Sequence, residues 1–150
     1  MTMSSGELLL TREFRLEMAH ALVGYDGQCS QIHGHSYRLE VTVGGACVES
    51  AEGAKMGMLI DFGAIKEAVE RSVIAQFDHS LVLRRAPQTE EVIEVLSRHF
   101  ERINAVEWQP TCENLLAHFA TLITPLLPAG IRLRSLRLHE TVNNCAELLF

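Results

Sequence analysis

The chain has 150 residues, of which 47% are apolar and 21% charged, and its formal net charge at pH 7 is −6. A chain of this length is expected to form a single domain, residues 1–150, that buries roughly two-thirds of its unfolded surface. The acidic balance argues against nucleic acid and anionic membranes as partners, because basic surfaces bind both. No apolar run approaches the ~18 residues of a membrane span.

Cysteine usage and the N-terminal residues indicate a compartment. The four cysteines are scattered and form no C-x-x-C pair. A disulfide framework is therefore not expected, and the thiols are predicted to be reduced. Residues 1–7 are small and polar, without the basic and apolar regions of a signal peptide. We expect them to be a disordered tail and the protein to be cytoplasmic.

Two strands are predicted near the start of the chain. Apolar and polar residues alternate over Leu8–His20 and more cleanly over His35–Val43. On the second strand the face that carries His35 also carries the apolar side chains. A loop over Val23–Ser30 precedes that strand, and a glycine- and alanine-rich connection over Gly44–Gly57 follows it.

Helical spacing dominates the middle of the chain. A helix is predicted to begin at Asp61 as N-cap and to end near Phe77. A shorter one follows Thr89, and another opens at Thr111, again as N-cap. An extra strand is expected near Ile103–Trp108.

Two strands are predicted at the end, over Ile131–Glu140 and Cys145–Phe150. Between them lies Asn143-Asn144, which suits a hairpin turn. The predicted order is therefore two strands, helices and two strands, which indicates an α+β protein.

His20, His33 and His35 form the most informative pattern of the chain. Because side chains alternate along a strand, His33 and His35 point the same way, and a histidine of a neighbouring strand can join them. Three neutral ligands leave the fourth tetrahedral position of Zn²⁺ open, as in catalytic sites. The bound metal would polarise a substrate hydroxyl or carbonyl oxygen.

Cys29, four residues before His33, is open to two interpretations. It is either a fourth zinc ligand, which would close a structural site, or a base beside the metal. A thiol needs a cation or partner to lose its proton at neutral pH. Asp78-His79 offers such a partner, since the carboxylate can orient the imidazole and the imidazole can relay a proton. The alternative for this pair is a helix cap with a histidine that complements the dipole.

Two carboxylates are candidates for substrate binding. Glu140, at the end of an apolar strand, must be solvated or paired. Its alternative is a charge on an edge strand, and the alternative for Glu113 is a first-turn carboxylate favoured by the helix dipole. The remaining histidines have no partner spacing and are expected to be surface or packing residues: His99, His118 and His139.

Taken together, these residues resemble the 6-pyruvoyltetrahydropterin synthase and 6-carboxytetrahydropterin synthase family over nearly the whole chain. The matching parts are Phe14 to Ala19-His20, Cys29, His33-Gly34-His35, Tyr37, Gly57-Met58 to Asp61-Phe62, Asp78-His79, Pro110-Thr111, Glu113-Asn114 and Glu140-Thr141. Each part is weak alone, but their order is specific.

The resemblance implies a tunnelling fold (T-fold): a four-stranded antiparallel sheet with helices on one face, which oligomerises into a β-barrel. Trimers or hexamers with active sites between subunits are expected, so that Asp78 and His79 serve the Cys29 and zinc of a neighbouring chain. The pterin ring would be held by Glu113 and Glu140, with Thr111 among the substrate-binding residues.

Three residues separate Cys29 from His33, as in the bacterial 6-carboxy enzymes, whereas the 6-pyruvoyl enzymes generally have a longer gap. The resemblance therefore predicts conversion of 7,8-dihydroneopterin triphosphate to 6-carboxy-5,6,7,8-tetrahydropterin, with loss of acetaldehyde and triphosphate, on the route to queuosine. The alternatives are the 6-pyruvoyl reaction, which eliminates triphosphate without splitting the carbon chain, and a non-catalytic zinc- or pterin-binding module.

Two features depart from the family pattern. Val82-Leu83 stand where many members have Leu-Asn, and residues 84–109 form an extension that resembles a subset with an added helix and strand. The sequence does not single out which arginines meet the triphosphate; the candidates are Arg38, Arg84, Arg85, Arg132 and Arg134.

Overall fold

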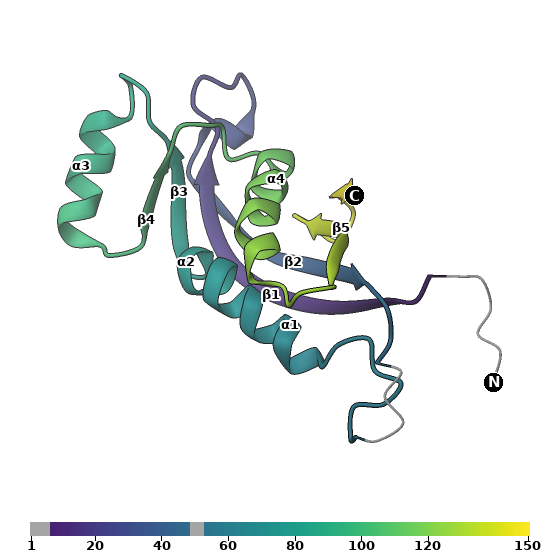
Figure 1. The fold of residues 1–150 in the computed structure, drawn as a ribbon. Helices are drawn as coiled ribbons and strands as arrows, with labels where there is room; N and C mark the ends of the chain where they lie inside the picture. The colour runs from purple at the N-terminus through teal and green to yellow at the C-terminus, as the bar shows by residue number, and fades with distance from the viewer. Residues whose placement is uncertain (1–6, 49–52) are drawn as a thin grey trace.

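The computed structural model describes residues 7–48 and 53–150. Its strands are β1 (Leu9–Ala21), β2 (His33–Gly44), β3 (Ser80–Arg84), β4 (Ile103–Val106), β5 (Arg132–His139) and β6 (Cys145–Leu149). Its helices are α1 (Phe62–Val69), α2 (Ala75–Phe77), α3 (Glu90–His99) and α4 (Cys112–Ile123), with a π-helical segment η2 (Glu70–Ile74) and 3-10 turns η1 (Gln28–Ser30) and η3 (Thr124–Leu126). Figure 1 shows the arrangement.

The long hairpin of β1 and β2 forms the centre of the sheet, as the alternation of the sequence predicts. The strands pair antiparallel from Leu9 opposite Gly44 to His20 opposite His33. Leu16 and Leu39 are 1% and 0% exposed, while the residues between the buried positions face outward. Each fully buried leucine of this kind contributes about 1.5–3 kcal/mol to folding.

The last two strands also form the predicted hairpin, although with a different turn. Asn143 and Asn144 do not take the positive φ of a tight two-residue turn. Instead the Thr141 hydroxyl accepts hydrogen bonds from the N–H groups of both asparagines, at 3.3 and 3.1 Å. The turn is therefore stabilised by the hydroxyl of Thr141 rather than by asparagines with a positive φ.

The expected four-stranded antiparallel sheet is only part of the sheet observed. In the described residues six strands pair in the order β4-β3-β1-β2-β5-β6. β1, β2, β5 and β6 are antiparallel neighbours, but β3 runs parallel to β1, and β4 runs parallel to β3. The sheet is mixed because the helix that ends at Phe77 returns the chain to the free edge of β1.

The helices α1, α2 and α4 cover one face of the sheet, which we call the helical face (Figure 1). Both predicted N-caps are confirmed: Asp61 accepts a hydrogen bond from Gly63 N at 2.7 Å, and Thr111 accepts one from Asn114 N at 3.3 Å. Phe119 of α4 is fully buried in the main core.

The expectation of helices on one face is wrong at one end of the sheet. Ile93 of α3 packs with Ala21 and Leu83 in a small second core, whereas Val82 belongs to the main core. Since neighbours along a strand point to opposite faces, α3 covers the face opposite to α4 (Figure 1). We call this second face the open face, because α3 covers it only at β3, β4 and the end of β1.

Residues 1–6 of the predicted disordered tail, and residues 49–52 of the connection before α1, lie outside the described residues. Glu7, the last residue of the predicted tail, pairs with Arg134 of β5. Within the described ranges, no helix is long and apolar enough to cross a membrane.

Candidate metal centre and active site

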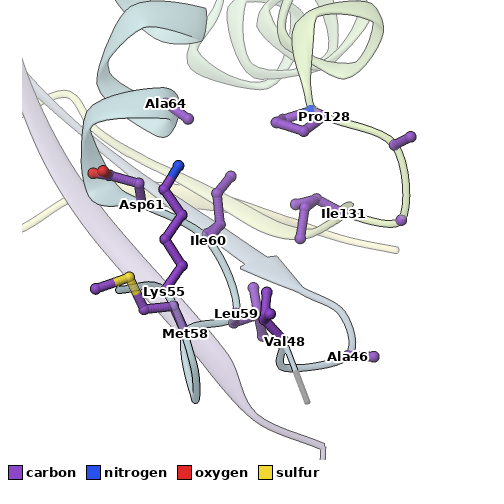
Figure 2. Close-up of a pocket in the computed structure, with 12 residues that line it drawn as sticks. Ala46, Val48, Lys55, Met58, Leu59, Ile60, Asp61, Ala64, Pro128 and Ile131 are labelled. Atoms are coloured by element: carbon purple, nitrogen blue, oxygen red, sulfur yellow. The ribbon is translucent and has the colours of Figure 1, made fainter. Parts of the chain in front are cut away.

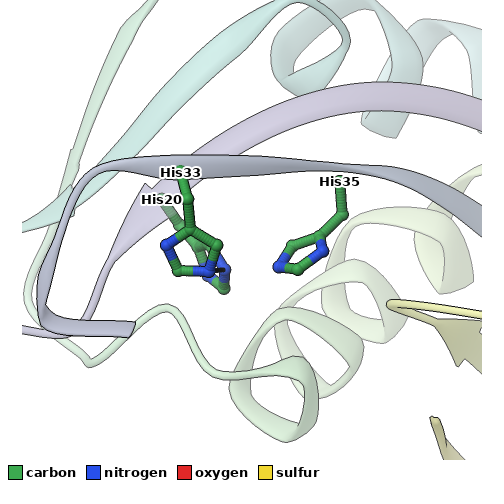
Figure 3. Close-up of side chains that lie close together, drawn as sticks. All are labelled: His20, His33 and His35. Atoms are coloured by element: carbon green, nitrogen blue, oxygen red, sulfur yellow. Dashed lines mark hydrogen bonds between the residues drawn. The ribbon is translucent and has the colours of Figure 1, made fainter. Parts of the chain in front are cut away.

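Three histidine side chains converge at the end of the β1–β2 hairpin (Figure 3). His20 lies directly opposite His33, and His35 follows on the same face of β2. One nitrogen of each ring lies within 4.8 Å of the others, and the Nε2 atoms of His20 and His33 are 3.1 Å apart. The strand register thus brings together the three residues predicted to bind a metal.

Backbone carbonyls determine which nitrogen carries the proton in two of these rings. His20 Nδ1 lies 2.7 Å from the Pro110 oxygen, and His33 Nδ1 lies 2.8 Å from the Gln31 oxygen. A carbonyl only accepts, so each Nδ1 donates, and in each neutral ring Nε2 bears a lone pair. Two lone pairs that face each other at 3.1 Å repel unless a cation lies between them.

The surroundings of the third ring, His35, also favour a bound cation. His35 Nε2 is buried and, within the described residues, has no hydrogen-bond partner. Burial lowers the pKa of His35 and that of His20, which keeps both rings in the neutral form that binds metals. The residues therefore fit a metal ion held by three nitrogens with a further position open.

Glu140 places its carboxylate beside the three histidines. Its Oε1 lies 3.7 Å from His20 Nε2 and 3.9 Å from His35 Nε2, and the Tyr37 hydroxyl donates to it at 3.2 Å. Burial, followed by the charge of Glu140, raises the pKa of Tyr37 and keeps this hydroxyl a donor. The sequence assigns Tyr37 no role, although its place two residues after His35 on the same strand face is a signal for one.

Cys29 lies in η1, which a 2.8 Å hydrogen bond from Leu22 N to Cys29 O ties to the end of β1. Its sulfur is not part of the group of ligand atoms that the three histidines form in the described chain. The half-buried thiol is near enough to Tyr37 to contribute, after burial and Glu140, to the raised pKa of that tyrosine. Within the described chain, the three histidines therefore form the candidate ligand group without Cys29.

Gln109 and Pro110 support the site, and the sequence gives no sign of this role. The Gln109 side chain donates to Val23 O at 2.6 Å and accepts from Val23 N at 3.1 Å, which fixes the loop that leads to Cys29. The next residue, Pro110, supplies the carbonyl that orients His20. These contacts join residues about 90 positions apart, so no local pattern reveals them.

The start of α4 carries the other predicted substrate-binding residues. Thr111 uses its hydroxyl as the helix cap, and Glu113 is exposed in the first turn. Burial raises the pKa of the Cys112 thiol to about 11, with further contributions from Glu140 and Glu113. Both carboxylates therefore lie around Cys112, with Glu140 beside the histidines and Glu113 toward solvent.

Asp78 and His79 are in contact on the turn between α2 and β3. Asp78 Oδ2 lies 3.0 Å from His79 Nδ1, and Asp78 Oδ1 accepts from Glu17 N at 2.8 Å. Burial tends to raise the pKa of Asp78, but the hydrogen bonds from Glu17 and His79 outweigh it and hold the pKa below its usual value. The His79 side chain is 74% exposed.

A single chain does not bring this pair to the histidine trio. His79 lines a hollow of about 440 Å³ together with Glu17, Ala19, Gly34 and Ser36, and His35 of the trio also borders it. Glu17, Ala19, Gly34 and Ser36 alternate with the histidines along their strands and therefore belong to the open face, whereas the side chains of the trio lie on the helical face.

Another hollow, of about 340 Å³, lies at the far end of the sheet (Figure 2). Met58, Ile60 and Ile131 give it an apolar wall, and Lys55 and Asp61 lie at its edge. It contains none of the residues predicted for the site.

An antiparallel sheet extended by two parallel strands, with three converging histidines, defines an α+β protein of the tunnelling fold with a candidate metal centre. A family model described as 6-pyruvoyl tetrahydropterin synthase matches residues 9–149. The chain belongs to this family, which is a family of enzymes.

Curated relatives support the same assignment. The chain is 31% identical over 140 residues to the 6-carboxy-5,6,7,8-tetrahydropterin synthase of Rickettsia felis, an alignment that covers 92% of this chain and 97% of that protein. It is 29% identical over 139 residues to the protein of the same name from Haemophilus influenzae, with 92% and 96% covered.

Solved structures share the fold. An uncharacterized protein from Wolinella succinogenes, WS1659, superposes with a TM-score of 0.79 at 16% identity, with 97% of this chain and 99% of that chain covered. The 6-pyruvoyl tetrahydropterin synthase of Caenorhabditis elegans gives a TM-score of 0.69 at 18% identity and covers 99% of each chain.

Proposed function

We propose that the chain is a zinc-dependent lyase that converts 7,8-dihydroneopterin triphosphate to 6-carboxy-5,6,7,8-tetrahydropterin, with release of acetaldehyde and triphosphate. The observation that carries the proposal is the trio of histidine nitrogens, two with lone pairs oriented toward each other and one buried without a partner. The 6-carboxy names of the curated relatives support this product.

The metal would be held by His20, His33 and His35. Three neutral nitrogen ligands with an open position are typical of catalytic zinc. When bound, Zn²⁺ supplies Lewis-acid polarisation of a substrate oxygen.

Carboxylates would recognise the pterin ring through hydrogen bonds. Glu140 can accept paired hydrogen bonds from the amino and imino groups of the ring, and the Tyr37 hydroxyl keeps this carboxylate in place. Glu113, with Thr111 at the start of α4, would complete the substrate-binding side.

Proton transfer would fall to Cys29 and to the pair of Asp78 and His79. Cys29, as thiolate, takes a proton from a side-chain carbon of the substrate, and the electron pair left there displaces triphosphate by breaking its carbon–oxygen bond. Asp78 holds His79 through the 3.0 Å contact with Nδ1, which orients the other ring nitrogen to return protons. Tautomerisation then moves two hydrogens from the side chain to the ring, which reaches the tetrahydro level while the side chain gains two adjacent carbonyls. Addition of one water to the first carbonyl, with cleavage of the carbon–carbon bond between them, forms the 6-carboxyl group and releases the two terminal side-chain carbons as acetaldehyde.

The position of the two faces supports an active site between subunits. Because the histidine trio and His79 lie on opposite faces of one sheet, we propose that His79 serves the metal centre of a neighbouring subunit in a trimer or hexamer. On this proposal the protein is cytoplasmic and works on the route to queuosine.

Two of the candidate arginines lie far from the metal centre of their own chain. Arg132 opens β5 and His139 ends it, and seven residues of extended strand span about 23 Å. Arg134 pairs with Glu7 at the same distant end. Any contact of Arg132 or Arg134 with the triphosphate would therefore come from another subunit.

An assay of the zinc-loaded protein with dihydroneopterin triphosphate tests the reaction, with pterin mass and acetaldehyde both followed. We expect the 6-carboxy product and acetaldehyde in equal amounts. A pyruvoyl side chain without acetaldehyde would instead establish the 6-pyruvoyl reaction.

Cys29→Ala separates the remaining alternatives. We expect the variant to keep its zinc and lose turnover, whereas the matched change of the exposed Cys145 to alanine leaves both unchanged. Loss of zinc from Cys29→Ala would show that Cys29 is a fourth ligand. Unchanged activity of Cys29→Ala would exclude it as the base, and inactivity of the native protein would point to a binding module.

A further inference from the structure

The helical run from Phe62 to Phe77 ends directly before the contacting pair Asp78 and His79. The last four carbonyl groups of a helix have no partners within the helix and require them elsewhere. Here the partners come largely from outside the helix, and two of them belong to the segment that forms β4.

Arg102, the residue before β4, bonds to two of these carbonyls. Its Nη1 donates to Ala75 O at 3.0 Å and to Asp78 O at 2.8 Å. A cation at the negative end of a helix dipole is favourable. Among the described residues, no carboxylate lies within 4.0 Å of the Arg102 guanidinium, so its hydrogen bonds go to the helix end rather than to an ion pair.

Two further side chains complete the helix end. Asn104 Nδ2 donates to Gln76 O at 3.0 Å, and Ser80 Oγ donates to Phe77 O at 2.7 Å. The carbonyls of four successive residues, 75–78, thus each accept a hydrogen bond from a side chain, and three of the four are bonded by residues 102 and 104.

The turn that follows needs this support. His79 has a φ of +56°, the only positive φ outside glycine in the described chain, and such a conformation is unfavourable for a residue with a Cβ. Two hydrogen bonds join the turn to β1: His79 N donates to Glu17 O at 2.6 Å, and Glu17 N donates to Asp78 Oδ1 at 2.8 Å. The position of the imidazole therefore depends on where the helix end is held.

We propose that Arg102 and Asn104 are positioning residues, which fix the end of α2 and thereby hold Asp78 and His79 in place. The extension over residues 84–109 then has a role in the reaction, because it brings β4 alongside β3 and both side chains onto the helix end. The catalytic part of this inference rests on the proposed function of His79, but the structural part does not.

The structural part is tested by amide hydrogen exchange. In Arg102→Ala, we expect exchange at His79 N–H and Glu17 N–H to rise about tenfold or more, because the helix end no longer holds the turn, while the centre of β2 stays protected. Asn104→Ala, which removes a single bond, should show a smaller increase at the same amides. The control is Arg98→Ala, since Arg98 bonds only to the exposed Glu94 on α3.

The catalytic part is tested by kinetics of the zinc-loaded protein. We expect Arg102→Ala to lower kcat about tenfold with little change in KM, because binding of the pterin does not involve the turn. Arg102 is exposed, so added guanidinium at millimolar concentration should restore part of the lost kcat. Arg98→Ala should match the native protein and show no response to guanidinium.

The outcomes are distinct. Unchanged exchange at His79 and Glu17 in both Arg102→Ala and Asn104→Ala overturns the inference. Faster exchange with unchanged kcat overturns its catalytic part. If the native protein itself has no activity, the exchange result still decides the structural part. Should Arg102→Ala fail to fold, Arg102→Lys and Asn104→Ala decide in its place, with exchange at the two amides as the readout.

Discussion

The histidine trio shows how single hydrogen bonds can prepare a candidate metal site. Pro110 O and Gln31 O each take the proton of an Nδ1, so the lone pairs of two Nε2 atoms meet at 3.1 Å. These carbonyls fix the ring orientation and the tautomer before any metal binds, as outer-shell partners of metal-binding histidines generally do.

Removal of one ring should abolish tight metal binding. For His33→Gln we expect zinc affinity to fall by more than the roughly 10–100-fold that loss of an outer-shell partner costs. Competition with a chelator of known affinity measures it. His139→Gln is the matched control, because His139 contacts Arg38 and Glu40 rather than the trio. Equal affinities in both variants would contradict the assignment of His33.

Tyr37→Phe tests the support of Glu140. The ring of Tyr37 packs edge-to-face on His20 and His35 and is 1% exposed, so phenylalanine keeps the packing. Loss of the hydroxyl should lower the free energy of unfolding by about 1 kcal/mol, as measured in urea. KM for the pterin should rise with zinc content unchanged, because Glu140 Oε1 is no longer held. An unchanged KM would show that Glu140 keeps its position without Tyr37.

Asp78 gives the protein an acid-dependent contribution to stability. Its pKa is below the usual value in the folded chain, so its contribution to the free energy of unfolding is complete above pH ~4 and is lost as pH falls through the folded pKa. Asp78→Asn should therefore be less stable than the native protein at pH 7, and the difference should narrow below pH ~4. Urea unfolding at several pH values measures this. Asp26→Asn, at an exposed position in the loop after β1, is the control for loss of a carboxylate elsewhere.

At the scale of elements, the departure from the family pattern at Val82-Leu83 has a packing reason. β3 is buried on both faces, with Val82 in the main core and Leu83 in the small core beneath α3. Leu83 is 3% exposed, so an asparagine there would lie beneath Ile93. The leucine is therefore matched to the added helix.

Leu83→Asn should lower the free energy of unfolding by about 3 kcal/mol, because it removes a buried apolar side chain and buries an amide. Leu81→Asn is the control on the same strand face, and its half-buried position predicts a smaller loss. Urea unfolding compares the two. Equal losses would show that the small core does not depend on Leu83.

The elements that the sequence predicts well are those in which a regular pattern extends over many residues. β1 and β2 alternate over more than ten residues, and their bounds differ from the expected ones by one or two positions. The sequence does not predict β3, because this strand is only five residues long and follows a helix with no glycine or proline between them. The chain changes direction at His79, which has a positive φ. Histidine seldom adopts this conformation, so the sequence does not predict it.

The candidate site likewise has one part that local sequence patterns predict and another part that depends on the fold. His33 and His35 are apparent from their spacing on one strand, because alternation is a local property. The contacts of His20 with Pro110 and of Tyr37 with Glu140 join positions 90 and 103 residues apart, and they depend on strand order. The sequence predicts the candidate ligands, whereas the groups that orient them follow only from the fold.

At the scale of the whole molecule, the described sheet ends in two strands with one unpaired edge each, β4 and β6. Leu149 of β6 is 70% exposed and Phe150, which follows it, 56%. Open edges with apolar side chains favour pairing with another chain. Together with the placement of the trio and His79 on opposite faces, this favours an oligomer whose active sites lie between subunits.

Complementation between two inactive variants tests that arrangement. Cys29→Ala and His79→Ala should each be inactive, and a refolded equal mixture should regain activity. If each site takes Cys29 from one subunit and His79 from another, random assembly leaves about a quarter of the sites intact, so about a quarter of native activity is expected. The double variant Cys29→Ala/His79→Ala, mixed in equal amount with the native protein, controls for exchange of subunits and should also retain about a quarter. If both residues of each site came from the same chain, the first mixture would stay inactive and the second would retain half, so the two mixtures together distinguish a shared site from one within a single subunit.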